Sequence, residues 1–189
     1  GLHTYYHFIH LTFQEYLVAS WISRESAEDL EGFILKNRYN SAYRLTLAFL
    51  AGAIFHADNS FNKIATNTFF ATLTQDWTTD LTPPSAFALL LRCLNECTGY
   101  TGKIPSLDRF LEGDSSLLDM TIDIADFQYN FPCVLWLSFQ GLIQALRWLV
   151  NQKGSDILQI IDSTGLTVMH ATHGRLEMME WLHQQDPSL

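Results

Sequence analysis

Charged side chains are scarce in this sequence, and basic ones are the scarcest. They make up 16% of the 189 residues, with 11 basic against 20 acidic residues and a net charge of −9. A typical soluble domain has about 25% charged residues. Because no basic stripe can release counterions from a phosphate backbone, nucleic acid is excluded as a partner. The shortage of charge also predicts apolar surface that other parts of a larger protein cover.

Cysteines and long apolar runs are limited as well. The three cysteines show no disulfide-framework spacing, which favours a reducing, cytoplasmic environment. The most apolar run, residues 45–55, has eleven residues, whereas a membrane-spanning helix needs roughly 20. We therefore expect a buried core helix there and no membrane partner.

The sequence also lacks a catalytic set, which would need a nucleophile, a base and an orienting group at compatible spacing. No catalytic residue is therefore predicted. Residues 99–104 imitate a phosphate-binding loop, but Ile104 stands where a Mg²⁺-binding hydroxyl is needed, and a loop after a helix explains them better. Cys93 and Cys97 lie one helical turn apart with no second ligand pair close by, which favours core thiols over a metal site. Cys133 has no His or Asp arrangement to activate it.

Three histidines near the start of the chain invite a metal interpretation: His3, His7 and His10. On a strand, His3 and His7 share a face and His10 does not, so coordination by all three is awkward. No metal ligand is predicted.

What the sequence does contain is a succession of apolar stripes at helical spacing between residues 12 and about 124. The first predicted helix, residues 12–23, would bury Phe13, Leu17 and Trp21, and Ser26 would begin the second. Short loops between such helices favour stacking in layers, so we expect an all-α, α-solenoid-like bundle. The other expected helices are residues 41–56; a helix capped by Asn59 or Ser60 with Phe61, Ile64, Ala65, Phe69 and Leu73 inward; a helix that opens at residues 82–85 and ends at Gly99; and residues 106–111.

Two stretches have the pattern of strands. Residues 118–124 alternate apolar and polar side chains, which is the period of a strand, and a helix there would place aspartates on both faces. Residues 5–10 are expected to form a short strand that runs directly into the first helix, with Thr12 as its N-cap and Glu15 at the spacing of a capping box. Because this strand would have no partner nearby, we expect the chain to be part of a larger protein.

This junction resembles the end of the winged-helix domain in NACHT-type signalling ATPases, the STAND class that includes the NOD-like receptors. The resemblance implies that His10 contacts the phosphate of ADP held by an upstream nucleotide-binding module, in an intact parent protein only. Without that module, His10 is interpreted as a partly buried histidine that closes a strand. Residues 43–52 and 90–97 resemble the second helical domain of the same proteins. The positions that carry the first resemblance are Phe8, His10, Thr12, Phe13, Gln14, Glu15, Tyr16 and Ala19, while Ser20 replaces the usual Ala.

The C-terminal third resembles ankyrin repeats. Asp162, Gly165, Thr167 and His170 match the repeat's D-x-x-G-x-T-P-L-H-x-A pattern, with Val168 in place of the usual Pro. The resemblance implies that Gly165 permits a tight turn and that Thr167 and His170 tie this turn to the first helix of the repeat.

The spacing of two glycines supports the same resemblance. Gly141 and Gly174 are thirty-three residues apart, which is the ankyrin period, and the residues after each look like the second helix of a repeat. The interval between His170 and Gly174 is too short for a full first helix. Only one repeat is recognisable, and its neighbours diverge from the pattern.

Three parts are therefore predicted: residues 1–11 as the end of a winged-helix-like segment, 12–125 as a helical domain, and 126–189 as an incomplete array of ankyrin-like repeats. The expected function is a non-catalytic scaffold that links an upstream nucleotide switch to an ankyrin arm for protein partners. No cofactor is expected in this chain, and ADP or ATP is implied for the parent. The alternative is a bacterial effector in a host cytosol, with an enzymatic activity based on Cys133 or Cys97.

Overall fold

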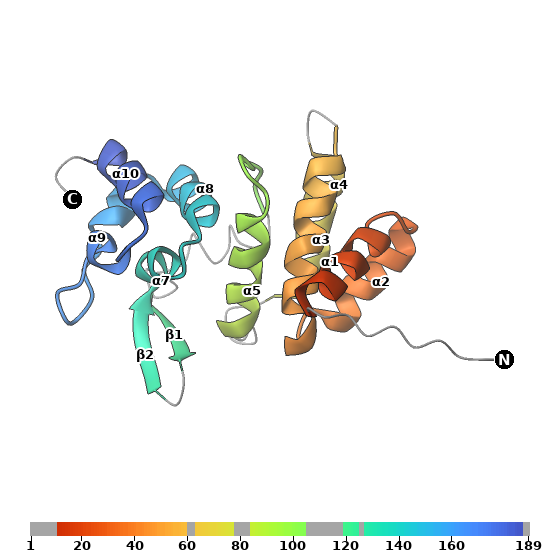
Figure 1. The fold of residues 1–189 in the computed structure, drawn as a ribbon, viewed down its shortest axis with the longest axis horizontal. Coiled ribbons are helices and arrows are strands. Elements are labelled where there is room, and N and C mark those ends of the chain that lie inside the picture. Colours follow the sequence, from red (N-terminus) through yellow and green to blue (C-terminus); the bar gives the residue numbers. More distant parts are fainter. Residues whose placement is uncertain (1–10, 60–62, 78–83, 105–118, 125–126, 187–189) are drawn as a thin grey trace.

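The structure is a computed structural model of the chain, and it describes residues 11–59, 63–77, 84–104, 119–124 and 127–186. Its helices stand side by side in one row, with the first two at one end and the last two at the other (Figure 1). The predicted all-α fold is confirmed, and the predicted strand at residues 5–10 and helix at 106–111 lie outside the described residues. The helices of the described residues are α1 (Leu11–Ile22), α2 (Ala27–Asn37), α3 (Arg44–Ala57), α4 (Ile64–Leu73), α5 (Pro84–Asn95), α7 (Cys133–Gln140), α8 (Ile143–Lys153), α9 (Val168–Ala171) and α10 (Leu176–Gln185), together with the short 3₁₀ helices η1 (Ser41–Tyr43) and η3 (Ser155–Gln159).

Helix α3 lies at the centre of the row. It is apolar on several of its sides, and other helices cover these sides. It packs against α1, α4 and α5, and α5 in turn packs against α8. Leu47 and Leu50 of α3 and Leu90 of α5 are fully buried. The same hydrophobic core continues into the helices of the C-terminal third, so burial of one connected apolar surface holds the row together.

The close approach of α3 to the end of α5 depends on a glycine. A Cβ atom built on Gly52 would lie 3.1 Å from the Cβ atom of Glu96. Any side chain at position 52 would therefore push the two helices apart or shift Glu96. Burial raises the pKa of the Glu96 carboxyl, and the charge of His56 opposes that change.

Helix starts were predicted with mixed success. The hydroxyl of Ser26 accepts a hydrogen bond from the backbone N–H of Asp29 at 3.2 Å, so the predicted N-cap of α2 is confirmed. Thr12 was wrong as an N-cap, because Leu11 and Thr12 already belong to α1 and an N-cap residue lies outside the helix.

Helix α4 begins later than predicted, at Ile64 rather than after Asn59 or Ser60. Its capping group comes from the end of α3: the N–H of Thr66 donates to the carboxylate of Asp58 at 3.2 Å. Helix α5 ends at Asn95, four residues before the predicted Gly99, and the chain continues through tight turns. Gly99 does adopt a left-handed conformation there, with φ of +82°.

The burial predictions for α1 were wrong. Phe13, Leu17 and Trp21 are exposed by 67, 50 and 62%. Ala19 and Ile22 are the buried residues of this helix. Since α1 is apolar around most of its circumference, the sequence pattern did not show which side would face α3.

The inward face of α4 was predicted partly correctly. Phe69 and Leu73 are buried, whereas Ile64 and Ala65 are exposed. The apolar side chains of the first turn of α4 therefore lie largely on the surface. Phe61 lies outside the described residues.

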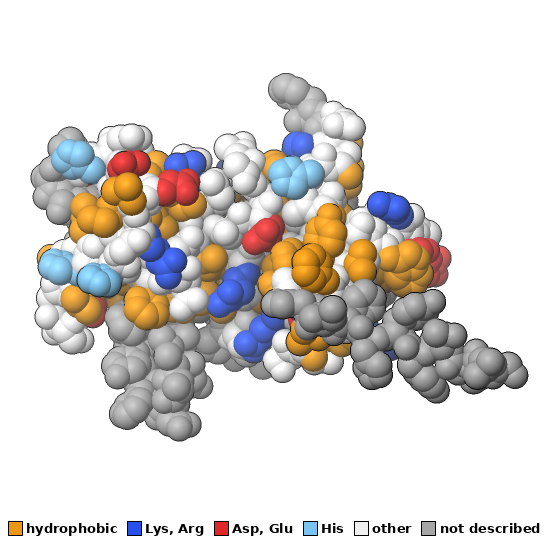
Figure 2. Space-filling view, in the orientation of Figure 1, with side chains coloured by type: hydrophobic (Ala, Val, Ile, Leu, Met, Phe, Trp, Pro, Cys, Tyr) orange, Lys and Arg blue, Asp and Glu red, His pale blue; other side chains and the backbone are white. Residues whose placement is uncertain are grey.

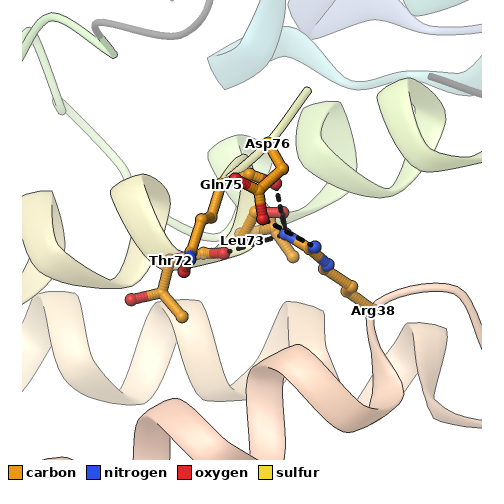
Figure 3. Close-up of polar contacts among 5 residues, drawn as sticks. All are labelled: Arg38, Thr72, Leu73, Gln75 and Asp76. Carbon is orange, nitrogen blue, oxygen red and sulfur yellow. Dashed lines mark hydrogen bonds and ion pairs between the residues drawn. The ribbon is translucent and has the colours of Figure 1, made fainter. Parts of the chain in front are cut away.

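A largely buried arginine joins the ends of α2 and α4 (Figure 3). Arg38, the C-cap residue of α2, donates from Nη1 to the carbonyl oxygens of Thr72, Leu73 and Gln75 at 3.4, 3.5 and 2.5 Å. Its Nη2 lies 3.9 Å from the carboxylate of Asp76, which is largely exposed. Carbonyl groups at a helix C-terminus lack partners within the helix and carry partial negative charge, so this cation satisfies them and complements the helix dipole.

The predicted strand after the helical region is confirmed. β1 (Asp119–Ile124) pairs antiparallel with β2 (Phe127–Pro132), and this hairpin leads directly into α7. It lies at the edge of the row, beside α7 (Figure 1).

The described helices are too short for a bilayer. The longest of them, α3, has 14 residues and is about 21 Å long, against a hydrocarbon core of about 30 Å. None of the helices in the described ranges is long and apolar enough to cross a membrane.

Candidate functional site

The turn before α9 is built around one carboxylate. Oδ1 of Asp162 accepts hydrogen bonds from the N–H of Thr164, the hydroxyl of Thr164 and the N–H of Leu166, at 2.8, 2.7 and 2.9 Å. The N–H of Asp162 donates to the carbonyl of Leu166 at 3.0 Å and closes the turn. Gly165 has φ of +86°, a conformation that costs other residues strain.

Thr167 and His170 connect this turn to α9. Oγ1 of Thr167 lies 2.9 Å from Nδ1 of His170, and the N–H of Thr167 donates to the same nitrogen at 3.4 Å. The two residues form a capping box in which a histidine takes the position usually held by Glu or Gln. The three predicted motif residues, Gly165, Thr167 and His170, therefore lie together in one exposed turn.

The residues around this turn belong to two successive helix pairs, α7 with α8 and α9 with α10. Gly141 and Gly174 separate the helices of each pair and have nearly equal φ values, +74° and +75°. Residues that are thirty-three positions apart are buried in both pairs. These equivalent buried pairs are Leu135 with Val168, Ala145 with Met178, Trp148 with Trp181, and Leu149 with Leu182.

The two helix pairs differ in length and in contacts. The first helix of the second pair, α9, is a single turn of four residues, as the short interval between His170 and Gly174 predicts. Arg175 donates to the carbonyl of Phe139 at 2.7 Å, and the guanidinium of Arg147 lies 5.6 Å from the ring centre of Trp181. Side chains from each pair thus bind the other, and the two pairs form one arm.

The arm is joined to the helical row at residues 99–104. Nε1 of Trp148 donates to the carbonyl of Gly102 at 3.0 Å. On the other side of this loop, the hydroxyl of Tyr100 donates to Oδ1 of Asn67 at 2.7 Å. A Cβ atom on Gly102 would lie 2.5 Å from the Tyr100 ring. Glycine is therefore required for the ring and the loop to pack this closely.

A cavity of about 390 Å³ opens beside the same loop, lined by Phe55, Lys63, Asn67 and residues 99–102. The amine of Lys63 donates to the carbonyl oxygens of Phe55, at 3.1 Å, and Asp58, and lies 4.5 Å from the ring centre of Phe55. Burial, with a smaller effect of Cys97, raises the pKa of Tyr100 to about 12. The lysine caps the end of α3 and the tyrosine remains protonated, so both side chains serve the packing of the joint.

The cysteines are all buried. Burial raises the pKa of Cys133 to about 12. Burial and the charge of Glu96 raise that of Cys97 to about 12, against a smaller opposite effect of Lys63. Burial, Cys97 and Glu96 raise the pKa of Cys93 well above its ordinary value. These thiols are protonated core residues at neutral pH.

The N-terminal motif residues are only partly described. Phe8 and His10 lie outside the described residues. Phe13 and Gln14 are exposed on α1, and Glu15 is half-buried. Within the described ranges, no three His, Cys, Asp or Glu side chains lie close enough together to hold a metal ion. Sequence reasoning missed Lys63, Asn67 and Trp148, because nothing local in the sequence shows that they meet one loop.

The Asp162 turn predicts a pH dependence. Desolvation raises the pKa of Asp162, but hydrogen bonds from Thr164, Leu166 and Gly165 outweigh it and hold the pKa below the ordinary value. A carboxyl whose pKa is lowered by folding stabilises the protein above the unfolded pKa of about 3.9, and this contribution is lost as the pH falls through the folded pKa.

We expect Asp162→Ala to lower the free energy of unfolding at pH 7 by about 1 kcal/mol. Thermal unfolding, measured from neutral to acidic pH, should show that the stability difference between Asp162→Ala and the native chain becomes smaller below pH about 4. Asp162→Asn keeps an acceptor oxygen without the charge and should be less damaging at neutral pH. A constant difference across this pH range would contradict the role assigned to the carboxylate.

Comparison with known proteins gave no match to this chain among family models, curated proteins or solved structures.

Proposed function

We propose that this chain is a non-catalytic scaffold whose C-terminal arm binds a protein partner. The observation that carries the proposal is the thirty-three-residue correspondence between α7 with α8 and α9 with α10, in burial and in glycine conformation. Tandem helix pairs bury one continuous core and leave their connecting turns on the surface, where partners bind. The arm would be ankyrin-like, as the resemblance of residues 162–171 implies.

The link to an upstream nucleotide switch rests on the N-terminal resemblance. In a longer cytoplasmic protein with that module, ADP would lie against His10, and the row of helices would carry movements between the module and the arm. There, His10→Ala is expected to weaken ADP binding, as measured by calorimetry, and an unchanged affinity would remove this part of the proposal.

The alternative, an effector that uses a cysteine nucleophile, is disfavoured by the raised pKa values of Cys97 and Cys133. A thiol of pKa about 12 carries roughly a thousandfold less thiolate at neutral pH than an ordinary exposed cysteine. We expect iodoacetamide to modify the native chain very slowly and all three thiols quickly after denaturation, as followed by mass spectrometry. If one thiol reacts fast in the native chain and has a near-neutral pKa, the result would support the enzyme hypothesis.

The binding role of the arm can be tested with a matched pair of variants. Ile161, next to the Asp162 turn, and Ile64, at the start of α4, are exposed by 60 and 64%. Affinity capture from the native cells should recover a partner that Ile161→Ser loses at least severalfold and that Ile64→Ser retains. A partner that both variants retain equally binds elsewhere and would contradict the proposed arm.

A further inference from the structure

The outer side of α1 carries an apolar stripe that the chain leaves exposed. We define the α1 stripe as Phe13, Leu17 and Trp21, which follow one another at four-residue intervals and therefore lie on one face of the helix. Phe13 keeps a contact within the chain, yet two thirds of it is exposed. Leu11 and Tyr16 of the same helix are also more than half exposed.

The size of this surface is that of a functional patch. Large apolar side chains have on the order of 150–250 Å² of surface each, so the exposed parts of Phe13, Tyr16, Leu17 and Trp21 amount to roughly 450 Å², which is in the range of patches that are often functional. A stable interface buries about 800 Å² on each partner, so these side chains would supply about half of one side. A helix that is apolar around most of its circumference is normally buried, and among the described helices α3 makes the main contacts with this one.

Charge next to the stripe indicates the kind of partner. The chain turns directly from the end of α1 into residues 24–31, through the bonds from the N–H of Arg24 to Trp21 and from the N–H of Glu25 to Ile22. This acidic segment contains one arginine and four carboxylates: Glu25, Glu28, Asp29 and Glu31. On the face seen in Figure 2, hydrophobic side chains gather over the α1 and α2 end, with acidic ones at its edge.

We infer that the α1 stripe binds an amphipathic helix of a partner protein, with apolar residues at i, i+4 and i+7 and with lysine or arginine beside them that faces residues 24–31. An apolar helix face laid along another is a common mode of recognition, and the acidic segment would set its orientation. A second copy of this chain fits less well, because two chains of net charge −9 would meet with their acidic segments close together. This site lies at the opposite end of the row from the arm, so it extends the proposed function and does not depend on it.

Tryptophan fluorescence reports directly on the stripe. All five tryptophans are described; Trp21 is exposed, and the other four are buried. Acrylamide quenching of the native chain should therefore come mainly from Trp21. The probe is a short amphipathic peptide of leucine and lysine, with leucines at i, i+4 and i+7, and its control has glutamate in place of lysine.

We expect the leucine–lysine peptide to reduce quenching and the leucine–glutamate peptide to leave it unchanged. Leu17→Ser should raise the dissociation constant at least tenfold, and Leu176→Ser, which removes a still more exposed leucine on α10, should not change it. The double variant Glu28→Lys with Glu31→Lys should reverse the preference between the two peptides. Circular dichroism checks that each variant is folded, as expected for exposed positions.

Four results would overturn the inference. Absence of Trp21 quenching in the free chain would mean that the chain covers its own stripe. Loss of quenching with rising protein concentration alone would make the stripe an interface between copies. Equal binding of both peptides would remove the charge preference, and binding unaffected by Leu17→Ser would show attraction of the cationic peptide to the acidic chain as a whole.

Discussion

Replacement of Trp148 by alanine is expected to lower the free energy of unfolding by about 3–5 kcal/mol, the largest effect among these predictions. The indole is only 2% exposed, and its N–H donates to the carbonyl of Gly102. Alanine would leave a cavity and a carbonyl without its donor at the joint between the arm and the row. Since domains have a total stability of about 5–15 kcal/mol, this variant should unfold at a much lower urea concentration.

One further variant separates the packing of Trp148 from its hydrogen bond, and another serves as a control. Trp148→Phe keeps most of the apolar volume and loses the N–H group, so we expect a smaller loss of about 1–3 kcal/mol. Trp21→Phe changes an exposed tryptophan and should stay within about 0.5 kcal/mol of the native chain. Urea unfolding followed by circular dichroism measures all three, and equal stability of Trp148→Ala and Trp21→Phe would show that the joint contributes nothing.

The second large effect is expected at Arg38. Arg38→Met keeps much of the buried stem but removes the guanidinium, which leaves the carbonyl oxygens of Thr72, Leu73 and Gln75 without this donor. Hydrogen bonds from charged donors contribute about 1.5–3 kcal/mol, so we expect a loss of about 2–3 kcal/mol on urea unfolding. Arg38→Lys should lie between, because an ammonium cannot reach as many acceptors at once.

Asp76 distinguishes the carbonyl contacts from the ion pair. Its carboxylate is 77% exposed and 3.9 Å from Arg38, and exposed ion pairs are worth at most about 1 kcal/mol. Asp76 also has φ of +62°, which asparagine tolerates well. We therefore expect Asp76→Asn to be nearly neutral. A loss as large as that of Arg38→Met would mean that the ion pair, rather than the carbonyl contacts, holds the two helix ends together.

Local chemistry made part of this fold predictable. The hydroxyl of Ser26 and the carboxylate three residues later identified the start of α2, and alternation from residue 118 identified β1. The pattern around Gly165 anticipated a tight turn at a residue with positive φ. In each case the group that decides the structure lies within a few residues of its partner.

Side chains with distant partners were not predictable. Lys63, which follows α3 in the chain, donates to a carbonyl at the C-terminal end of α3. Asp58, which precedes α4, accepts a hydrogen bond from the first turn of α4. Arg38 finds its acceptors thirty-four to thirty-seven residues away. The pattern of apolar residues in α1 allowed several faces to be buried, and the stripe assigned to the core proved to be the exposed one.

By itself, then, the sequence determined that this protein is helical, where most of its helices lie, and that a glycine followed by a helix recurs at an interval of thirty-three residues. These properties follow from 3.6-residue periodicity, helix caps and glycines with positive φ, all of which act over short distances along the chain. Only the tertiary structure decided which face of α1 remains exposed, how Trp148 joins the arm to the row, and which carbonyls Arg38 satisfies. Those outcomes depend on which elements meet in space, and burial is a property of the whole packed core rather than of any one segment.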